Sequence, residues 1–146
     1  DQLIKPNGLA LIQAITIEDF RYATALKSVD FIKRYVFPGS FIPSVSAITG
    51  SMARSTQLGL IELADFGASY ARTLKSWRER FDAAWESIEP MGFDDVFRRR
   101  WRFYLAYCEG AFAERAISDV HLLMAGPDFR SVEATGLTAQ TRAIPS

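Results

Sequence analysis

The stretch "KPNGLALIQAITIEDF", residues 5–20, contains the pattern that decides the fold class. Turn residues at 6–8 lead into an apolar run from Leu9 to Ile17 that is broken at Gln13. Because the run does not alternate, it is typical of a strand covered on both faces, as in a parallel sheet. Parallel strands are joined through crossover helices, and little sequence precedes this strand. We therefore expect the other strands of its sheet to lie outside this chain.

Two consecutive segments predict long helices. Apolar and aromatic side chains recur every three or four residues over 74–88 and again over 93–112. Asp94 and Asp95 stand near the start of the second segment, where the helix dipole favours negative charge. Each segment is thus predicted to present an apolar stripe to the rest of the fold.

Shorter elements fill the rest of the chain. Pro43 suits the first turn of one helix, and Ser28 or Asp30 is a candidate N-cap of another. A second strand is expected to bury Leu60, Ile61 and Leu63. The full prediction is helices over 18–26, 31–36, 43–54, 74–88 and 93–112, and strands over 9–17, 58–66 and 117–125. This order predicts an α/β fold, but three strands are too few for a doubly wound sheet.

Composition excludes several classes of protein. The chain has 146 residues, and its hydrophobic content of 49% argues for a packed domain and against disorder. Its 17 basic and 17 acidic residues cancel, so we expect no nucleic-acid partner. Cys108 is the single cysteine, which excludes an intrachain disulfide and fits a reducing compartment. With one cysteine and one histidine, no metal site is predicted.

Four blocks of sequence carry a resemblance to a known family. They are "LIQAITI" (11–17), "FIKRYVFPGSFIPS" (31–44), "FGASYARTLKSWRERFDAAW" (66–85) and "FRRRWRFYLAYCEGAF" (97–112). In this order they resemble the C-terminal half of the cyclopropane-fatty-acyl-phospholipid synthases and mycolic acid cyclopropane synthases. The likeness extends over residues 6–125.

The resemblance implies the C-terminal part of a class I, Rossmann-like methyltransferase fold. The opening strand would be the fifth strand of that sheet, and the last two strands would form its antiparallel edge hairpin. The N-terminal strands that bind S-adenosylmethionine would lie outside this chain. Residues 1–126 would belong to the methyltransferase domain, and residues 127–146 would form a loosely ordered tail.

The resemblance also implies a reaction and its partners. A methyl or methylene carbon would pass from S-adenosylmethionine to the cis double bond of an unsaturated phospholipid acyl chain, with a bound bicarbonate ion as base. This chain alone would be inactive and would need the missing N-terminal half or a second copy of itself. Two alternatives remain open: a methyltransferase acting on another small molecule, such as an amine, or a non-catalytic lipid-binding or interaction fragment. An exposed strand edge at residues 9–17 would favour the fragment, because an unpaired edge seeks a partner.

Three residues match catalytic positions of the family: Gln13, Ile15 and Tyr70. The family carries a histidine where this chain has Gln13, uses the backbone N–H at the position of Ile15, and binds bicarbonate through the tyrosine that matches Tyr70. An amide can hold an anion but cannot titrate, so this departure puts cyclopropane formation in doubt. The alternative is that Gln13 is structural and satisfies neighbouring groups.

Five residues match the wall of the family's acyl-chain tunnel. They are Phe37, Ile42, Tyr104, Cys108 and Phe112. An acyl tunnel must be long and apolar, and helix-spaced aromatics can line it. A stripe of this kind is also typical of a plain helix core.

Basic residues on the two long helices suggest a membrane surface. They are Arg72, Lys75, Arg78 and Arg80 on the first, and Arg98, Arg99, Arg100 and Arg102 on the second. On a shared face they could meet anionic headgroups, but acidic residues are interleaved, and Arg78 could instead pair with Asp82 at i and i+4. We expect His121 to be structural. We expect a cytoplasmic protein that lies peripheral to the inner face of the membrane.

Overall fold

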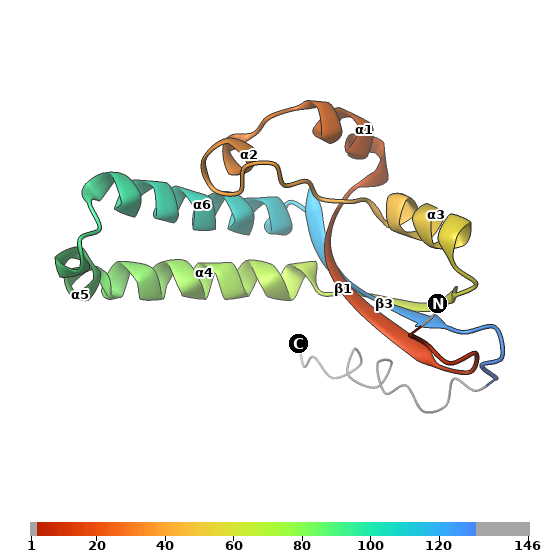
Figure 1. Cartoon of the computed structure of the whole chain (residues 1–146). Helices are drawn as coiled ribbons and strands as arrows, with labels where there is room; N and C mark the ends of the chain where they lie inside the picture. The colour runs from red at the N-terminus through yellow and green to blue at the C-terminus, as the bar shows by residue number, and fades with distance from the viewer. Residues whose placement is uncertain (1–2, 131–146) are drawn as a thin grey trace.

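A three-stranded antiparallel sheet joins the two ends of the described chain. The structure, a computed structural model, describes residues 3–130. Its strands are β1 (Leu9–Ile17), β2 (Gly59–Asp65) and β3 (Ile117–Ala125), in the spatial order β1-β3-β2 (Figure 1). The predicted antiparallel pairing of the last two strands is confirmed, with Asp65 opposite Val120.

The first strand pairs with β3, to which it runs antiparallel. Leu9, Leu11 and Ile12 are 42%, 53% and 44% exposed, whereas the apolar run predicted cover on both faces. The parallel neighbours predicted for this strand were expected outside this chain and stay a prediction. Within residues 3–130, β3 pairs with one edge of β1 and no strand pairs with the other edge.

The middle strand carries the core of the sheet. β3 has its predicted bounds, and its side chains from Leu122 to Ala125 are all buried, with Leu122 fully so. The prediction that Leu60 and Leu63 of β2 are buried is wrong, since they are 38% and 41% exposed. β2 lies at the edge of the sheet, where less of the protein covers its side chains.

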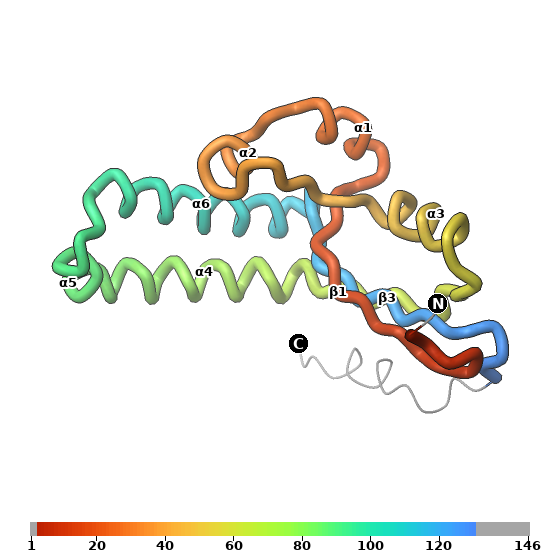
Figure 2. The backbone as a smooth tube through the Cα atoms, in the orientation of Figure 1, coloured from red at the N-terminus to blue at the C-terminus, as the bar shows by residue number. Residues whose placement is uncertain are grey.

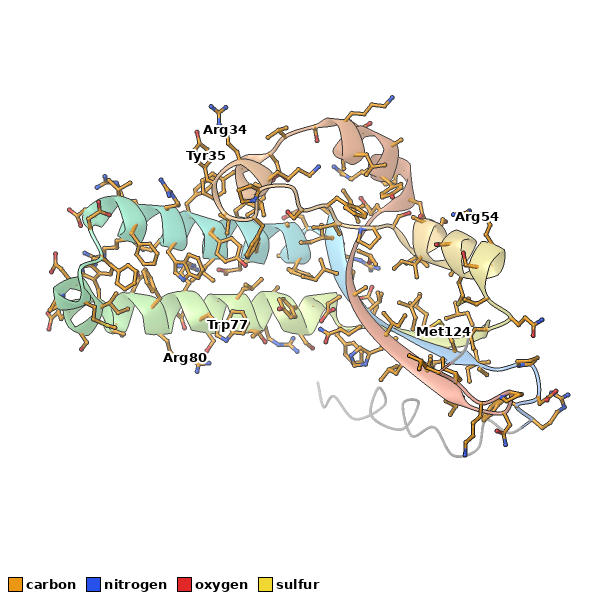
Figure 3. The ribbon with its side chains drawn as sticks, viewed as in Figure 1. Arg34, Tyr35, Arg54, Trp77, Arg80 and Met124 are labelled. Carbon is orange, nitrogen blue, oxygen red and sulfur yellow. The ribbon has the colours of Figure 1, made fainter. Side chains whose placement is uncertain are left out.

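Two long helices project together from one end of the sheet (Figure 1). They are α4 (Gly67–Ala83) and α6 (Asp95–Ala113), and their facing side chains fill the space between them (Figure 3). A short helix α5 (Trp85–Ile88) and a 3₁₀ turn η1 (Glu89–Met91) join their far ends. The predicted apolar stripes form this contact, whose buried centre is Leu74, Leu105 and Phe112.

Capping and charge pairs fix the two long helices. The side chain of Asp94 accepts a hydrogen bond from the backbone N–H of Phe97 at 2.8 Å, as expected for a helix start. The guanidinium of Arg78 binds Glu109 at 2.9 Å, and Arg102 binds Asp82 at 2.8 Å. The predicted pair Arg78–Asp82 within α4 is therefore wrong, because each of the two side chains forms its ion pair with a residue of α6.

Three short helices follow β1 and precede β2 in the chain, and Figure 2 shows them along one side of the molecule, above the sheet. They are α1 (Asp19–Lys27), α2 (Phe31–Tyr35) and α3 (Val45–Ser55). Asp30 caps α2 through the N–H of Lys33 at 2.9 Å, which selects it over Ser28 as the cap. Pro43 does not lie in the first turn of α3, as predicted, but before its N-cap, Ser44. The carbonyl of Pro43 instead accepts the N–H of Ile17 at 3.0 Å.

The two ends of the described chain are joined by backbone hydrogen bonds. Gly126 donates to the carbonyl of Gly8 and Asp128 to that of Pro6, both at 2.9 Å. Most of the predicted loose tail, residues 131–146, lies outside the described residues. In residues 3–130, no helix is long and apolar enough to cross a membrane, and no three metal-ligating side chains come together.

Replacing Gly67 with alanine should destabilise the junction between β2 and α4. A Cβ there would lie 2.5 Å from Oγ of Ser118, whose hydroxyl binds Asp65. We expect Gly67→Ala to lower the free energy of unfolding by about 1–3 kcal/mol, measured by denaturant titration. The matched control is Gly110→Ala in α6, where a Cβ meets nothing within 4 Å. The control should gain about 0.5–1 kcal/mol, since alanine favours helix; equal losses in both variants would contradict this account.

Asp19 should make stability depend on pH. Its carboxylate accepts the N–H of Ser46 at 3.0 Å and so ties α1 to the first turn of α3. Hydrogen bonds from Ser44 and Ser46 lower the pKa of Asp19. A lowered folded-state pKa adds stability above the unfolded pKa, and this stability is lost as the pH falls through the folded value. Asp19→Asn should therefore melt below the wild type at neutral pH but level with it in acid; an equal difference at both pH values would refute this.

Candidate functional site

A largely apolar cavity lies where the long helices meet the sheet. Its volume is about 380 Å³. Its walls come from the end of β1, from residues 19–42 (α1, α2 and the loop after them, here called the α1–α2 segment), from α4 and α6, and from the start of β3. In Figures 1 and 3 these elements converge where α4 and α6 approach β1, and Trp77, which lines the cavity, lies on α4.

All five predicted tunnel residues line this one cavity. They are Phe37, Ile42, Tyr104, Cys108 and Phe112. The rings of Phe37 and Tyr104 meet edge to face with centroids 5.9 Å apart. The structure thus places together residues from two distant segments, while their contact with a substrate stays a prediction.

The stripe of aromatic residues was predicted to be either a tunnel wall or a plain helix core, and in the structure some of its residues belong to both the helix core and the cavity wall. Phe112 and Leu74 belong to the buried centre of the α4–α6 contact and also line the cavity. The prediction omitted Leu74, Trp77 and Ala111 as wall residues. The sequence spacing could have identified these three residues, because they lie on the same helical stripes as the predicted residues.

Tyr70 lines the cavity at the first turns of α4. Its ring packs on Phe112 with centroids 4.7 Å apart and on Trp77 at 6.1 Å. Burial, then the negative charge of Asp119 and the nearby Cys108, raise the pKa of the Tyr70 hydroxyl. Tyr70 therefore remains a neutral hydrogen-bond donor at ordinary pH.

The other two predicted catalytic residues lie on β1. Ile15 lines the cavity, but Gln13 is not among the lining residues. The N–H of Ile17 points away from β3, since it donates to Pro43. N–H groups two residues apart in a strand point the same way, so the N–H of Ile15 also faces the open edge of β1.

Gln13 has a specific partner that the sequence did not reveal. Its Nε2 donates to Oδ2 of Asp119 on β3 at 2.9 Å. Asp119 is only 4% exposed, and its Oδ1 is buried without a hydrogen-bond partner. The only signal in the sequence was a carboxylate within the apolar strand segment "ISDVHLLMA". His121, directly across from Gln13, packs on Phe66 and has a buried Nδ1 without a partner.

These residues fit the implied bicarbonate ion poorly. Tyr70 and the N–H of Ile15 are donors, but the Gln13 amide is engaged by Asp119. A buried carboxylate beside the donors repels a second anion. For S-adenosylmethionine, the described residues offer no glycine-rich loop after a strand: Gly67, which follows β2, is packed against Ser118.

Sequence comparison gives the family. The profile of the mycolic acid cyclopropane synthetase family matches residues 1–122. The chain belongs to this family. Tuberculostearic acid methyltransferase UfaA1 of Mycobacterium tuberculosis is 39% identical over 112 residues, which cover 77% of this chain and 26% of that protein. The cyclopropane-fatty-acyl-phospholipid synthase of Escherichia coli K12 is 35% identical over 117 residues, or 80% of this chain and 29% of that protein.

Solved structures of the family share the fold. The cyclopropane synthase MmaA2 of Mycobacterium tuberculosis superposes with a TM-score of 0.71 at 24% identity, covering 83% of this chain and 45% of that one. Mycolic acid cyclopropane synthase CmaA1, in complex with SAH and CTAB, gives 0.71 at 22% identity, covering 85% and 46%. The predicted family and methyltransferase fold class are confirmed. The chain spans less than a third of the length of the two curated relatives and about half of the two solved chains.

Cys108 should be an unreactive wall residue. Burial, and to a lesser extent the charge of Asp30, raise the pKa of its thiol to about 11. Because the thiolate is the reactive form, alkylation by iodoacetamide at about pH 8 should be roughly 100-fold slower in the native protein than in the unfolded chain. Mass spectrometry of timed samples, with and without denaturant, measures both rates. Equal rates would show that the thiol is open to solvent and ordinary in its pKa.

Proposed function

We propose that this chain forms the acyl-binding part of an S-adenosylmethionine-dependent methyltransferase. The reaction transfers a methyl or methylene carbon to the cis double bond of an unsaturated phospholipid acyl chain. The observation that carries the proposal is that the five predicted wall residues, Ile15 and Tyr70 all line one apolar cavity. Its volume of about 380 Å³ falls within the range of small-molecule sites.

The lining suits a reaction that generates positive charge on a hydrocarbon. When bound, S-adenosylmethionine would supply an electrophilic methyl group, and an alkene that takes up this group, with the thioether as leaving group, would carry the positive charge. The aromatic faces of Tyr70, Tyr104 and Phe112 can stabilise such a charge by cation–π attraction. The apolar wall also keeps out water, which would otherwise trap the cation as an alcohol. The residues that hold the cofactor lie, in this proposal, outside residues 3–130.

Charged and apolar groups near the cavity favour a phospholipid as the donor of the acyl chain. Arg21 and Lys33 line the cavity, and exposed Phe20 and Val29 lie on the α1–α2 segment, 76% and 74% exposed. Basic groups near a membrane surface attract anionic headgroups. We propose a peripheral contact through this segment. Arg78 and Arg102 are engaged in ion pairs between α4 and α6, and Arg21 is paired with Glu18 at 2.7 Å. Lys33, whose ammonium donates to the carbonyls of Ala25 and Ser28 and not to an acid, is the charged lining residue left for this contact.

Filling the cavity tests the proposal. Ala111 lines it, so Ala111→Phe should reduce conversion of unsaturated phospholipid by 10-fold or more, about 1.4 kcal/mol in the barrier. The matched control is Ala113→Phe, two residues on in α6, where the side chain is exposed. The assay uses protein from the complete reading frame, vesicles of unsaturated phospholipid and labelled S-adenosylmethionine. Mass spectrometry of the acyl chains measures the product.

The control variant should keep wild-type turnover. If both variants lose activity equally, the cavity does not hold the acyl chain. The 146-residue chain by itself should give no product. Turnover by the chain alone would show that residues of this chain complete a cofactor site.

The alternatives can be weighed against the structure. An amine substrate could use the same aromatic faces, but it would find no free carboxylate in the described lining, because Asp30, the acidic residue there, already caps α2. The open outer edge of β1 does favour an interaction fragment, as the sequence analysis anticipated. Saturable binding of labelled S-adenosylmethionine to protein from the complete reading frame, together with lipid product, would exclude a non-catalytic role.

A further inference from the structure

Two segments that pack together beside the cavity carry positive charge and no acidic residue. Residues 31–42 contain two basic residues, residues 96–108 contain four arginines, and neither stretch has an aspartate or a glutamate. The first stretch includes α2, which lies over α6 in Figure 1, and the ring of Phe31 meets that of Phe103 edge to face at 4.6 Å. The balanced charge of the whole chain therefore conceals a local excess of positive charge.

Two of these arginines share one tyrosine. The guanidinium groups of Arg34 on α2 and Arg100 on α6 lie over the ring of Tyr35, 5.4 and 5.8 Å from its centroid. All three side chains are exposed, and within residues 3–130 neither arginine forms an ion pair. Figure 3 shows Arg34 and Tyr35 projecting from α2 on the side away from α4. Two like charges beside one ring repel each other, and a bound anion would remove that repulsion.

Exposed aromatic rings continue this surface along α6. Phe103 and Tyr107 stack with centroids 5.9 Å apart and are 51% and 41% exposed, while Tyr35 is 49% exposed. Tyr107 also lines the cavity. We call Arg34, Tyr35, Arg100, Phe103 and Tyr107 the arginine–aromatic face. This face therefore borders the cavity at Tyr107.

The composition of the arginine–aromatic face selects its partner. A cation–π contact with a tyrosine leaves N–H groups of an arginine free, and these match the oxygens of a phosphate. Exposed tyrosine rings suit the headgroup level of a bilayer, where one end of the ring meets an apolar layer and the other meets water. A soluble phosphate compound would use the arginines but not the rings, whereas the surface of a bilayer uses both.

We propose that the arginine–aromatic face binds the surface of an anionic phospholipid bilayer and opens the cavity toward it. The inference rests on the proposed function and extends the peripheral contact from the α1–α2 segment onto α6. Arg34 and Arg100 bind headgroup phosphates, while Phe103 and Tyr107 enter the boundary between headgroups and acyl chains. Tyr107, which belongs to both the face and the cavity wall, marks where an acyl chain passes from the bilayer into the cavity.

Vesicle co-sedimentation tests the inference without any need for turnover. Protein from the complete reading frame is mixed with vesicles of phosphatidylcholine, either alone or with an equal part of phosphatidylglycerol. The wild type should bind the mixed vesicles, more weakly as salt is added, and should bind phosphatidylcholine alone far less. Arg34→Gln combined with Arg100→Gln should weaken binding to the mixed vesicles about 10-fold or more, because each basic group near an anionic surface adds to the affinity.

A matched control removes the same charge from another surface. Arg72 and Arg80 on α4 are exposed and bind serine hydroxyls, each at 3.2 Å. Figure 3 shows Arg80 projecting from α4 on the side away from α6. Arg72→Gln combined with Arg80→Gln should bind the mixed vesicles as the wild type does. Equal losses in the two double variants would overturn the inference, as would a wild type that binds both kinds of vesicle equally or neither.

A single variant guards against a fold defect in the first double variant. Thermal melting identifies which proteins are folded. Arg34→Gln alone removes an exposed side chain of a short helix and should still weaken binding about 3-fold or more. If this folded variant binds the mixed vesicles as tightly as the wild type, the inference fails.

Turnover then separates this inference from the proposed function. With vesicles of unsaturated phospholipid, the Arg34 and Arg100 double variant should raise KM for lipid about 10-fold and leave kcat unchanged, because the face delivers the substrate and does not touch the reacting atoms. A loss in kcat at unchanged KM would overturn the inference but keep the proposed function. A wild type that gives no lipid product would refute the proposed function, while vesicle binding would still decide whether the face binds a bilayer.

Discussion

The antiparallel position of β3 between β1 and β2 is the constraint on which the other features depend. β3 follows β2 in the chain only after α4 and α6, yet pairs with it directly, so the two helices must leave and return at the same end of the sheet. They therefore form an antiparallel pair that projects from that end. The turn into α4 passes so close to β3 that Gly67 leaves no room for a Cβ beside Ser118.

The cavity follows from that arrangement. Where the helix pair meets the sheet, Leu74 of α4 and Phe112 of α6 belong both to the contact between the helices and to the cavity wall. The α1–α2 segment closes the remaining side, with Phe31 packed on Phe103 at a centroid distance of 4.6 Å. Side chains of the same stripes therefore pack the two helices together and also line the cavity.

The polar pair on the same face of the sheet joins two strands. The amide of Gln13 on β1 donates to Asp119 on β3, and Asp119 is 4% exposed. Neither residue is among those that line the cavity, so this hydrogen bond fixes β1 against β3, while Tyr70 and the aromatic side chains of α6 face the cavity.

Local features were predictable from the sequence. Such features depend on neighbours within a few residues. They are the bounds of β3, the caps Asp30 and Asp94, and the two aromatic stripes with the wall residues that lie on them. Features that depend on distant pairing were not. Sequence periodicity carries no information on strand direction. The predicted partner of Arg78 was wrong because sequence spacing identifies acids on the same helix but not Glu109, which lies on another helix. The contact between Gln13 and Asp119 joins residues 106 positions apart, and only the register of β1 on β3 brings them together.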